Sequence, residues 1–407
     1  MGAASGACSD AEYAAPMPLT TRPHARVNKK TGGGGESSAS TSHGARYWHD
    51  KMRLSAASQA VFAGAQSGDT RRVLASLNAH GDPNCVNYSG YSPVMLAVGG
   101  GYREVVALLL QASSDPNYSL GGLTPLMIAS AGGQLEVARM LVNCGARADM
   151  VDSDCGRSAL HRGGERGHAE VVRLLLQAGA SVDAGDWQGS TALMLAAKAG
   201  QTEAVRTILC AGASVTVADK EGNTALTLCV QAGHEAVLEA MLKACAPVNA
   251  ASHLNGDNGL TCAARRGSES MCRKLLQYQA NVNISNHKKE TPLMLAAGGG
   301  RTQVVHLLLL AGADSTLQDL DGRTALMHAA ASGCASAVST CLDFGASAST
   351  TSQVDGSTAL TDAAANGHTE VYKTLINAGA RISATEESQM EDASAQGQQY
   401  LQPVAAA

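Results

Sequence analysis

The stretch GSTALMLAAKAGQTEAVRTILCAGASV, residues 189–215, decides the fold because close variants of it recur along the chain. Variants begin at Gly222, Glu290 and Gly322, and a weaker copy lies near Gln59. The copies align on a small polar residue, at spacings of 32 to 34 residues: Ser92, Thr124, Ser158, Thr191, Thr224, Asn258, Thr291, Thr324 and Thr358. A period this constant predicts a stacked array of about ten repeats.

The copy at residues 189–222 predicts a helix, a turn, a second helix and a β-turn. Thr191 suits a helix N-cap, because its hydroxyl can accept a hydrogen bond from a free backbone N–H. The first helix should end at Gly200, since glycine tolerates the left-handed helix stop, and the second should begin near Thr202. Apolar residues of the second helix follow a helical period: Ala204, Val205, Ile208 and Leu209. Residues 219–222 have the composition of a β-turn, which we call the finger.

Two such short helices cannot be stable alone, because helix nucleation is costly and one face would stay in water. Stacking removes that exposure. Small residues in the first helices allow a close approach between copies: Ala196–Ala197, Ala263–Ala264, Ala296–Ala297, Ala329–Ala330 and Ala363–Ala364. Leucines of the second helices fill the layer between copies. The fold class that we expect is therefore all-α, a solenoid with a period of ~33 residues.

The pattern resembles the ankyrin repeat family. The family's T-P-L-H-x-A signature appears in variant form as TPLMIA, SALHRG, TALMLA, TPLMLA and TALMHA. Its second helix is best matched by GHAEVVRLLLQAGASV, residues 167–182, and the resemblance covers about four-fifths of the chain. The resemblance implies helix-turn-helix units with β-turn fingers. It also implies that partners bind on a concave face made by the fingers and the exposed side of each first helix.

Some copies depart from the family pattern. The signature histidine remains only at His161, and methionine or threonine replaces it elsewhere. The family's imidazole hydrogen-bonds to backbone near the fingers, which methionine cannot do although it packs well, so we predict fingers that are held by packing and more mobile than usual. Arg162 precedes Gly163 and Gly164, which indicates either an exposed arginine seam or sequence drift, of which we favour drift. Asp362 is predicted to be a polar cap of the last copy.

Composition and charge narrow the function classes. The 407-residue chain has a net charge of −5 and no broad basic field, which argues against nucleic-acid binding. No apolar stretch approaches the roughly 20 residues needed to cross a bilayer, and the N-terminus lacks a signal-peptide core. The eleven cysteines are scattered and form no C-x-x-C pair, which favours free thiols in a reducing compartment. We expect a cytoplasmic monomer.

The predicted domain organisation has three parts. Residues 1–53 form a disordered, Gly/Ser-rich and mildly basic arm, residues 54–385 form the repeat array, and residues 386–407 form a disordered acidic and low-complexity tail. Gly2 and Cys8 leave open an N-terminal lipid anchor, although the myristoylation pattern also wants a serine or threonine four residues after the glycine.

No constellation of catalytic residues emerges from the sequence. HEAVL, residues 234–238, lacks the second histidine of a zinc-protease helix. His168, His234 and His368 occupy one slot of the repeat, which favours a structural role. A solenoid also brings only neighbouring copies together, so distant residues do not converge on a deep pocket. We predict that the chain is not an enzyme and has no catalytic, cofactor-binding or metal-ligating residues.

Protein binding remains as the expected function. The resemblance places the predicted partner-binding residues on finger tips and first helices: Tyr88, Tyr91, Tyr118, Arg162, Arg166, Trp187, Lys198, Lys220, Arg265 and Arg266. Arginine, tyrosine and tryptophan dominate binding hot spots, and the cations grouped with Trp187 predict an acidic partner. We expect an intracellular adaptor or scaffold that binds a partner protein without catalysis. Two alternatives stay open: a membrane- or cytoskeleton-tethered structural linker, and an inhibitory regulatory subunit of an enzyme or transcription factor.

Overall fold

A computed structural model describes residues 55–380, which form twenty α-helices. The predicted N-terminal arm, with Gly2 and Cys8, and the predicted tail lie outside the described residues. The described chain divides into two compact units, of which the first ends at Gln188 and the second begins at Gly189. We call them unit 1 and unit 2 and describe each by itself.

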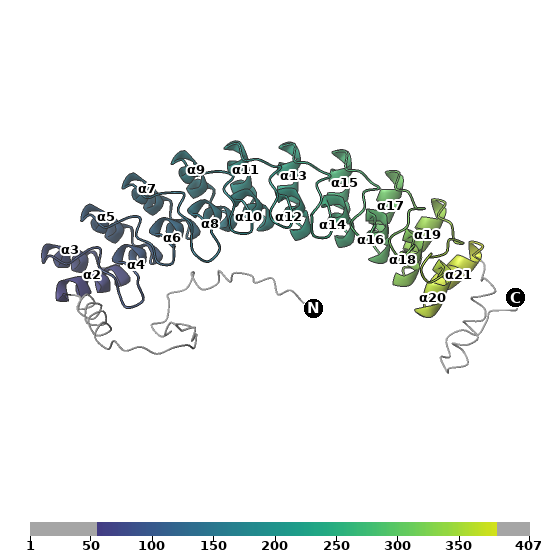
Figure 1. Cartoon of the computed structure of the whole chain (residues 1–407), viewed down its shortest axis with the longest axis horizontal. Coiled ribbons are helices and arrows are strands. Elements are labelled where there is room, and N and C mark those ends of the chain that lie inside the picture. Colours follow the sequence, from purple (N-terminus) through teal and green to yellow (C-terminus); the bar gives the residue numbers. More distant parts are fainter. Residues whose placement is uncertain (1–54, 381–407) are drawn as a thin grey trace, which may run out of the picture. The chain divides into compact units, whose positions relative to one another are not determined.

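Unit 1 consists of four copies of one helix pair (Figure 1). The bounds of its helices are α2 (Ala56–Ser67), α3 (Thr70–Asn78), α4 (Pro93–Gly99), α5 (Arg103–Gln111), α6 (Pro125–Ala131), α7 (Leu135–Asn143), α8 (Ala159–Arg166) and α9 (Ala169–Gln177). Even-numbered helices are the first of each pair and lie in one layer, while odd-numbered helices lie in a second layer. The predicted helix-turn-helix copy is confirmed.

Unit 2 repeats the same arrangement six times. The bounds of its helices are α10 (Ala192–Lys198), α11 (Thr202–Cys210), α12 (Ala225–Ala232), α13 (Glu235–Lys243), α14 (Gly259–Arg266), α15 (Glu269–Gln277), α16 (Pro292–Gly298), α17 (Thr302–Leu310), α18 (Ala325–Ser332), α19 (Ala335–Asp343), α20 (Ala359–Ala365) and α21 (Thr369–Asn377). The four copies of unit 1 and the six of unit 2 agree with the predicted total of about ten.

The local signals of the sequence act as predicted in the first copy of unit 2. The Thr191 hydroxyl accepts the N–H of Met194 at 3.3 Å, which caps α10. Gly200 and Gly212 end the two helices with φ values of 76° and 85°. Ala204, Val205 and Ile208 are fully buried in α11, and Leu209 is partly exposed.

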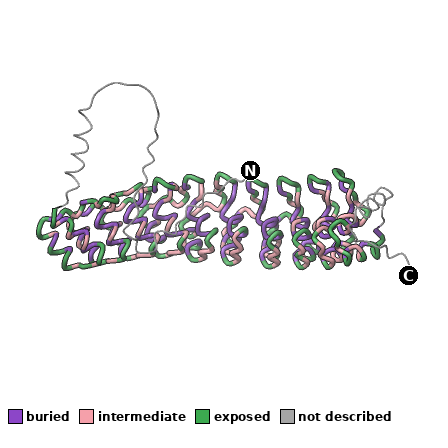
Figure 2. Tube along the Cα trace, turned by 90° about the horizontal axis from the view of Figure 1, so that it is seen from below, coloured by how far each residue is buried: buried purple, intermediate pink, exposed green. Residues whose placement is uncertain are grey.

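The core of each unit is a thin layer between neighbouring helix pairs. Buried alanines of the first helices allow the close approach, as in Ala196–Ala197, Ala296–Ala297 and Ala329–Ala330. Leucine, valine and methionine fill the remaining space. Figure 2 shows buried segments running through the helix pairs, with exposed turns along the edges. Each copy therefore depends on its neighbour for most of its burial.

The contacts at the position of the signature histidine bear on our prediction that methionine cannot replace its hydrogen bond. His161 Nδ1 accepts the backbone N–H of Ser158 at 3.2 Å, which completes a capping box at α8. Threonine makes the same hydrogen bond as the imidazole. The Oγ1 atoms of Thr227, Thr261 and Thr361 each accept the N–H of their N-cap residue, at 2.8, 2.8 and 2.7 Å.

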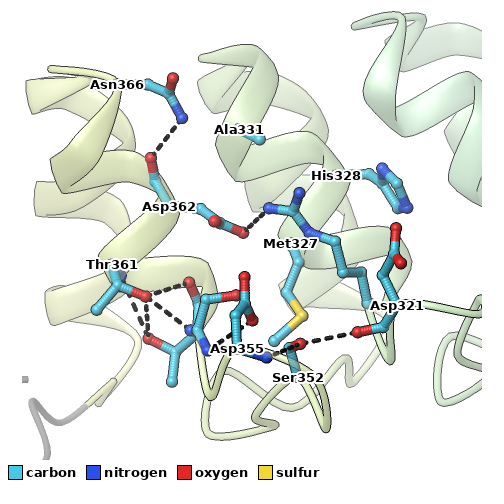
Figure 3. A network of polar contacts seen from close by, with 12 residues as sticks. Asp321, Met327, His328, Ala331, Ser352, Asp355, Thr361, Asp362 and Asn366 are labelled. Carbon is cyan, nitrogen blue, oxygen red and sulfur yellow. Dashed lines mark hydrogen bonds and ion pairs between the residues drawn. The ribbon is translucent and has the colours of Figure 1, made fainter. Parts of the chain in front are cut away.

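Methionine also accepts in this slot. The Sδ of Met294 and of Met327 each lie 3.4 Å from the N–H nitrogen of the N-cap threonine, and Figure 3 shows Met327 beside the polar network of the last copies. The premise that methionine makes no hydrogen bond here is therefore wrong. The greater finger mobility that we predicted from it stays a prediction without that support.

A second correction concerns Asp362. Its carboxylate accepts a hydrogen bond from Arg323 of the preceding copy, and its side chain is largely buried. Figure 3 shows Asp362 directed at that neighbouring guanidinium. Asp362 therefore joins two copies instead of presenting a polar outer face.

Gly163 gives a stability prediction with a built-in control. The same slot of the repeat holds a buried alanine in most copies, but glycine in α8 and at Gly64 in α2. A Cβ on Gly163 would lie 3.4 Å from Val172 Cγ2, an ordinary contact, whereas one on Gly64 would lie 2.6 Å from Val73 Cγ2. We expect Gly163→Ala to stabilise unit 1 by about 1 kcal/mol, because alanine forms helix better than glycine. Gly64→Ala should instead destabilise it by about 1–3 kcal/mol through overpacking.

Urea unfolding of the two variants measures this difference. A loss of stability in Gly163→Ala would mean that the α8 backbone needs glycine for another reason. Sequence drift in a tolerant copy then would no longer explain Gly163.

Candidate functional site

Each finger ends in a tip residue, four positions before the N-cap residue of the following first helix. The tips are Tyr88, Leu120, Asp154 and Trp187 in unit 1, and Lys220, Leu254, His287, Leu320 and Val354 in unit 2. Five of the six large apolar or aromatic tips are well exposed, namely Tyr88 85%, Trp187 51%, Leu254 71%, Leu320 59% and Val354 70%, whereas Leu120 is partly buried. The three aliphatic tips escaped the sequence analysis, although their common position in the repeat alignment was a signal that could have found them.

Backbone hydrogen bonds join most neighbouring fingers within a unit, whereas side-chain hydrogen bonds join the first two fingers of unit 1 and the last two of unit 2. In unit 1 the Trp187 N–H donates to Cys155 O at 2.9 Å. In unit 2 the His287 N–H donates to Asn255 O at 2.9 Å, and the Leu320 N–H donates to Lys288 O at 3.0 Å. Within each unit the tips therefore form a row whose spacing is fixed largely by main-chain bonds and does not depend on side-chain packing alone.

Trp187 has a second support in unit 1. Its ring packs against Gly156, where a Cβ would lie 2.3 Å from Trp187 Cδ1. Gly156 has a φ of 73°, so the close approach and the left-handed backbone both require glycine there. The other half of the indole is open to solvent, which leaves a rigid aromatic surface of the type that anchors protein interfaces.

The predicted arginines are mostly engaged within the chain. Arg162 donates to Asp152 Oδ2 at 2.8 Å in unit 1, and both side chains are largely buried. Arg265 donates twice to Asp257, at 2.7 and 2.9 Å, in unit 2. Asp257 is almost fully buried, so this pair holds the finger to helix α14. Arg162 and Arg265 thus position fingers, and their role toward an acidic partner stays a prediction.

Two positions of the repeat form an ion pair in two different copies, with the positive and negative residues exchanged. In unit 2 the residue before the N-cap of α14 is Asp257, and Arg265 lies eight residues after Asp257. In unit 1 the same two slots hold Arg157 and Glu165, which lie 2.9 Å apart. The exchange of sign shows that the interaction joins a finger to its own first helix, whichever side bears the positive charge.

The other predicted residues divide between structure and surface. Arg266 donates to Gln231 O at 2.8 Å and Arg166, which is exposed, also has a polar partner. The Tyr118 hydroxyl donates to Gly90 O at 2.7 Å, and burial raises the pKa of Tyr118. Tyr91 is partly buried. Tyr88, Lys198 and Lys220 are exposed as well.

The repeated histidine slot is structural, as predicted. His168 Nε2 donates to Ala131 O at 3.1 Å, and its ring packs on Gly133 of the preceding copy. His234 makes the same bond to Lys198 O, and His368 makes it to Ala331 O, each at 3.1 Å. The imidazoles therefore join copies instead of meeting in a catalytic group.

Buried thiols contribute no reactive nucleophile. Burial raises the pKa to about 12 for four of them and to about 11 for a fifth: Cys85, Cys229, Cys272 and Cys341, and then Cys262. Such thiols stay neutral near pH 7. Within residues 55–380, no group of three or more His, Cys, Asp or Glu side chains is placed to hold a metal ion. None of the helices described has the length and hydrophobicity of a membrane span.

Known proteins agree with this architecture. The family model "Ankyrin repeats (3 copies)" matches overlapping windows that extend from residue 60 to residue 386. Ankyrin repeat and SOCS box protein 3 of Bos taurus is 40% identical over 111 residues, which are 27% of this chain and 21% of that protein. The Homo sapiens protein of that name is 37% identical over 125 residues, 30% of this chain and 24% of that protein.

Two further similarities are narrower or structural. E3 ubiquitin-protein ligase KEG of Arabidopsis thaliana is 37% identical over 65 residues, 16% of this chain and 4% of that protein. The solved ankyrin repeat domain of Bcl-3 is 32% identical with a TM-score of 0.48, covering 51% of this chain and 95% of that one. The chain thus spans less than a quarter of the length of these three curated relatives. Because the family model matches well over half of the chain, the protein belongs to the ankyrin repeat family.

Proposed function

We propose that this protein is a non-catalytic adaptor or scaffold that binds a partner protein through its finger tips and the adjoining exposed sides of its first helices. Ankyrin repeats are protein-interaction modules. The cytoplasmic location expected from the cysteine pattern belongs to the same proposal.

The row of exposed apolar tips carries the proposal. Single exposed hydrophobic residues are ordinary on any surface. Here, however, Leu254, Leu320 and Val354 recur at one slot of unit 2, and Tyr88 and Trp187 occupy that slot in unit 1. Within each unit, hydrogen bonds between fingers fix much of the arrangement of these tips before a partner arrives, which reduces the entropy lost on binding.

Affinity capture with the full chain tests the proposal. Three baits are compared: the wild type, a finger variant and a matched control. The finger variant carries Trp187→Ser, Leu254→Ser and Leu320→Ser, and the control carries Leu74→Ser and Leu310→Ser, which change exposed leucines on second helices. We expect proteins that bind the wild type and the control to be lost from the finger variant. Proteins that bind all three baits, or that are lost only from the control, would place the binding surface elsewhere.

A further inference from the structure

One finger of unit 2 differs from all the others that the structure describes. The finger formed by residues 286–290 carries three consecutive basic side chains, His287, Lys288 and Lys289, and all three are exposed. Lys289 has a φ of 59° in the slot that every other described finger fills with a positive-φ glycine: Gly90, Gly122, Gly156, Gly189, Gly222, Gly256, Gly322 and Gly356. A side chain with a Cβ is strained in this left-handed conformation. The finger therefore retains a lysine where glycine is the relaxed choice.

The neighbouring structure holds this strained tip in place. The buried Asn286 accepts the N–H groups of Lys288 and Glu290 through Oδ1, at 3.0 and 2.9 Å. The Lys289 N–H donates to Asn286 O at 2.9 Å. Bonds from His287 N–H and to Lys288 O join the finger to its two neighbours. The backbone under the basic side chains is thus fixed on both sides.

The charges of Lys288 and Lys289 are not used within the described chain. Neither lysine forms an ion pair with another residue of the range 55–380, in contrast to Arg162 and Arg265. The two flanking fingers present Leu254 and Leu320 at the position equivalent to His287, and both leucines are more than half exposed. Two apolar tips therefore border a fixed basic tip.

We propose, on the basis of the protein-binding function argued above, that the fingers from Leu254 to Leu320 bind an acidic segment whose carboxylates are flanked by apolar side chains. The apolar side chains cover the two leucine tips and supply most of the affinity. The carboxylates face Lys288 and Lys289 and mainly select the partner and speed its approach.

The neighbouring charges favour a peptide over a nucleic acid. Glu290 and Asp321 lie on these fingers and Glu221 lies on the preceding one, and Glu221 and Asp321 are exposed. These carboxylates would repel a nucleic acid, because its phosphates repeat along its whole length. A short acidic segment with apolar flanks can place its charges on the lysine tip alone.

A displayed library of random twelve-residue peptides, selected on the full chain, tests the proposal. We expect the selected peptides to contain paired Asp or Glu between apolar residues. Lys288→Gln/Lys289→Gln should weaken them about three- to tenfold at low salt, as expected for two exposed ion pairs, and the loss should shrink at high salt. Leu254→Ser/Leu320→Ser should weaken them by about tenfold or more, because two apolar contacts are lost.

Two further variants separate binding from folding and from net charge. Lys289→Gly relieves the backbone strain, so its thermal midpoint should rise while its affinity falls. Lys243→Gln/Lys373→Gln removes the same charge from second helices and should bind the peptides as the wild type does.

Three outcomes would overturn the proposal. They are selected peptides without acidic residues, equal binding by the Lys288→Gln/Lys289→Gln variant, and lysine-dependent binding of a twelve-nucleotide uridine RNA in place of the peptides. Neutral peptides that need only Leu254 and Leu320 would refute the acidic specificity and leave the adaptor function standing. Failure of the adaptor function would appear instead in the capture experiment, as partners that ignore every finger variant.

Discussion

Arg162→Ala is expected to destabilise unit 1 by about 3 kcal/mol, because it leaves the buried carboxylate of Asp152 without its cation. This loss lies at the lower end of the range expected when a buried ion pair loses one partner. Asp152 Oδ1 still accepts backbone N–H groups from Asp154, Cys155 and Gly156, at 3.2, 2.7 and 3.0 Å. Only Oδ2 loses its partner. Hydrogen exchange in α8 and α9, followed with urea unfolding, measures the change.

The pH dependence gives this prediction a second readout. Burial opposes ionisation of Asp152, but the Cys155 N–H and Arg162 outweigh it and hold the pKa of Asp152 below its ordinary value. A carboxyl whose folded pKa is depressed stabilises the fold above its unfolded pKa, and that contribution is lost as the pH falls through the folded value. Arg162→Ala removes the cation and raises the folded pKa of Asp152, so the variant's loss of stability relative to the wild type should be largest near neutral pH and smaller at acid pH, where Asp152 is protonated.

Arg173→Ala is the matched control for the loss of an arginine in the same copy. Arg173 pairs with Glu170 on the exposed face of α9, and such pairs contribute about 0.2–1 kcal/mol. Equal effects of the two substitutions would show that the Asp152 pair holds nothing together. The pair matters for function as well, because it sets the finger that carries Asp154 against helix α8.

The repeat itself could be predicted from the sequence because its signals are local. Thr191, Gly200 and Gly212 act through hydrogen bonds and dihedral angles within a few residues, so a linear pattern contains the information. The buried alanine pairs are predictable for a similar reason, since one copy's geometry is imposed on all copies. The bounds of the helices follow from the same caps.

The fate of the arginines could not be predicted from residue type alone. Arg162 reaches an aspartate ten residues earlier, in a finger that also carries the exposed Asp154, and Arg265 reaches one eight residues earlier. Whether a finger carboxylate turns toward its helix depends on the turn geometry, which composition does not reveal. Comparing slots across copies would have helped, since Arg157–Glu165 repeats the Asp257–Arg265 pair with opposite signs.

The exposed leucines escaped prediction for a different physical reason. Leucine is buried more often than not, so Leu254 and Leu320 read as additional core residues in a linear pattern. Their exposure follows only from the position of the tip, which protrudes beyond the layer that the next copy covers. The candidate surface therefore rests on three-dimensional placement, while the fold rests on local sequence.

Removing both members of the Arg323–Asp362 pair is expected to stabilise the last copies of unit 2 by about 1–2 kcal/mol, although removing Asp362 alone should destabilise them by about 2 kcal/mol. Burial raises the pKa of Asp362, and the hydrogen bond from Arg323 only partly offsets it. The pair lies in the network of Figure 3, where Arg323 Nε is buried with no hydrogen-bond partner within residues 55–380. The free-energy cost of desolvating the two charged groups therefore exceeds the stabilisation that their ion pair provides.

The repeat supplies natural replacements for both residues. Leucine fills the Asp362 slot at Leu195, Leu228 and Leu295, and serine fills the Arg323 slot at Ser190 and Ser357. We thus expect Arg323→Ser/Asp362→Leu to repack the junction as other copies do. Asp362→Leu alone leaves the guanidinium without its carboxylate and should lose stability. Hydrogen exchange in α20 and α21 reports the local free energy of opening for both variants.

The pH profile of the double variant decides between desolvation and simple repacking. An acid whose folded pKa is raised destabilises the fold once it ionises, so the wild type loses stability as the pH rises from the ordinary value of 3.8 through the folded pKa of Asp362. The advantage of the double variant should accordingly be largest near neutral pH and smaller below pH 4. An advantage that stayed constant with pH would come from leucine packing alone. A double variant less stable than the wild type would show that the ion pair is a net support of the terminal copy.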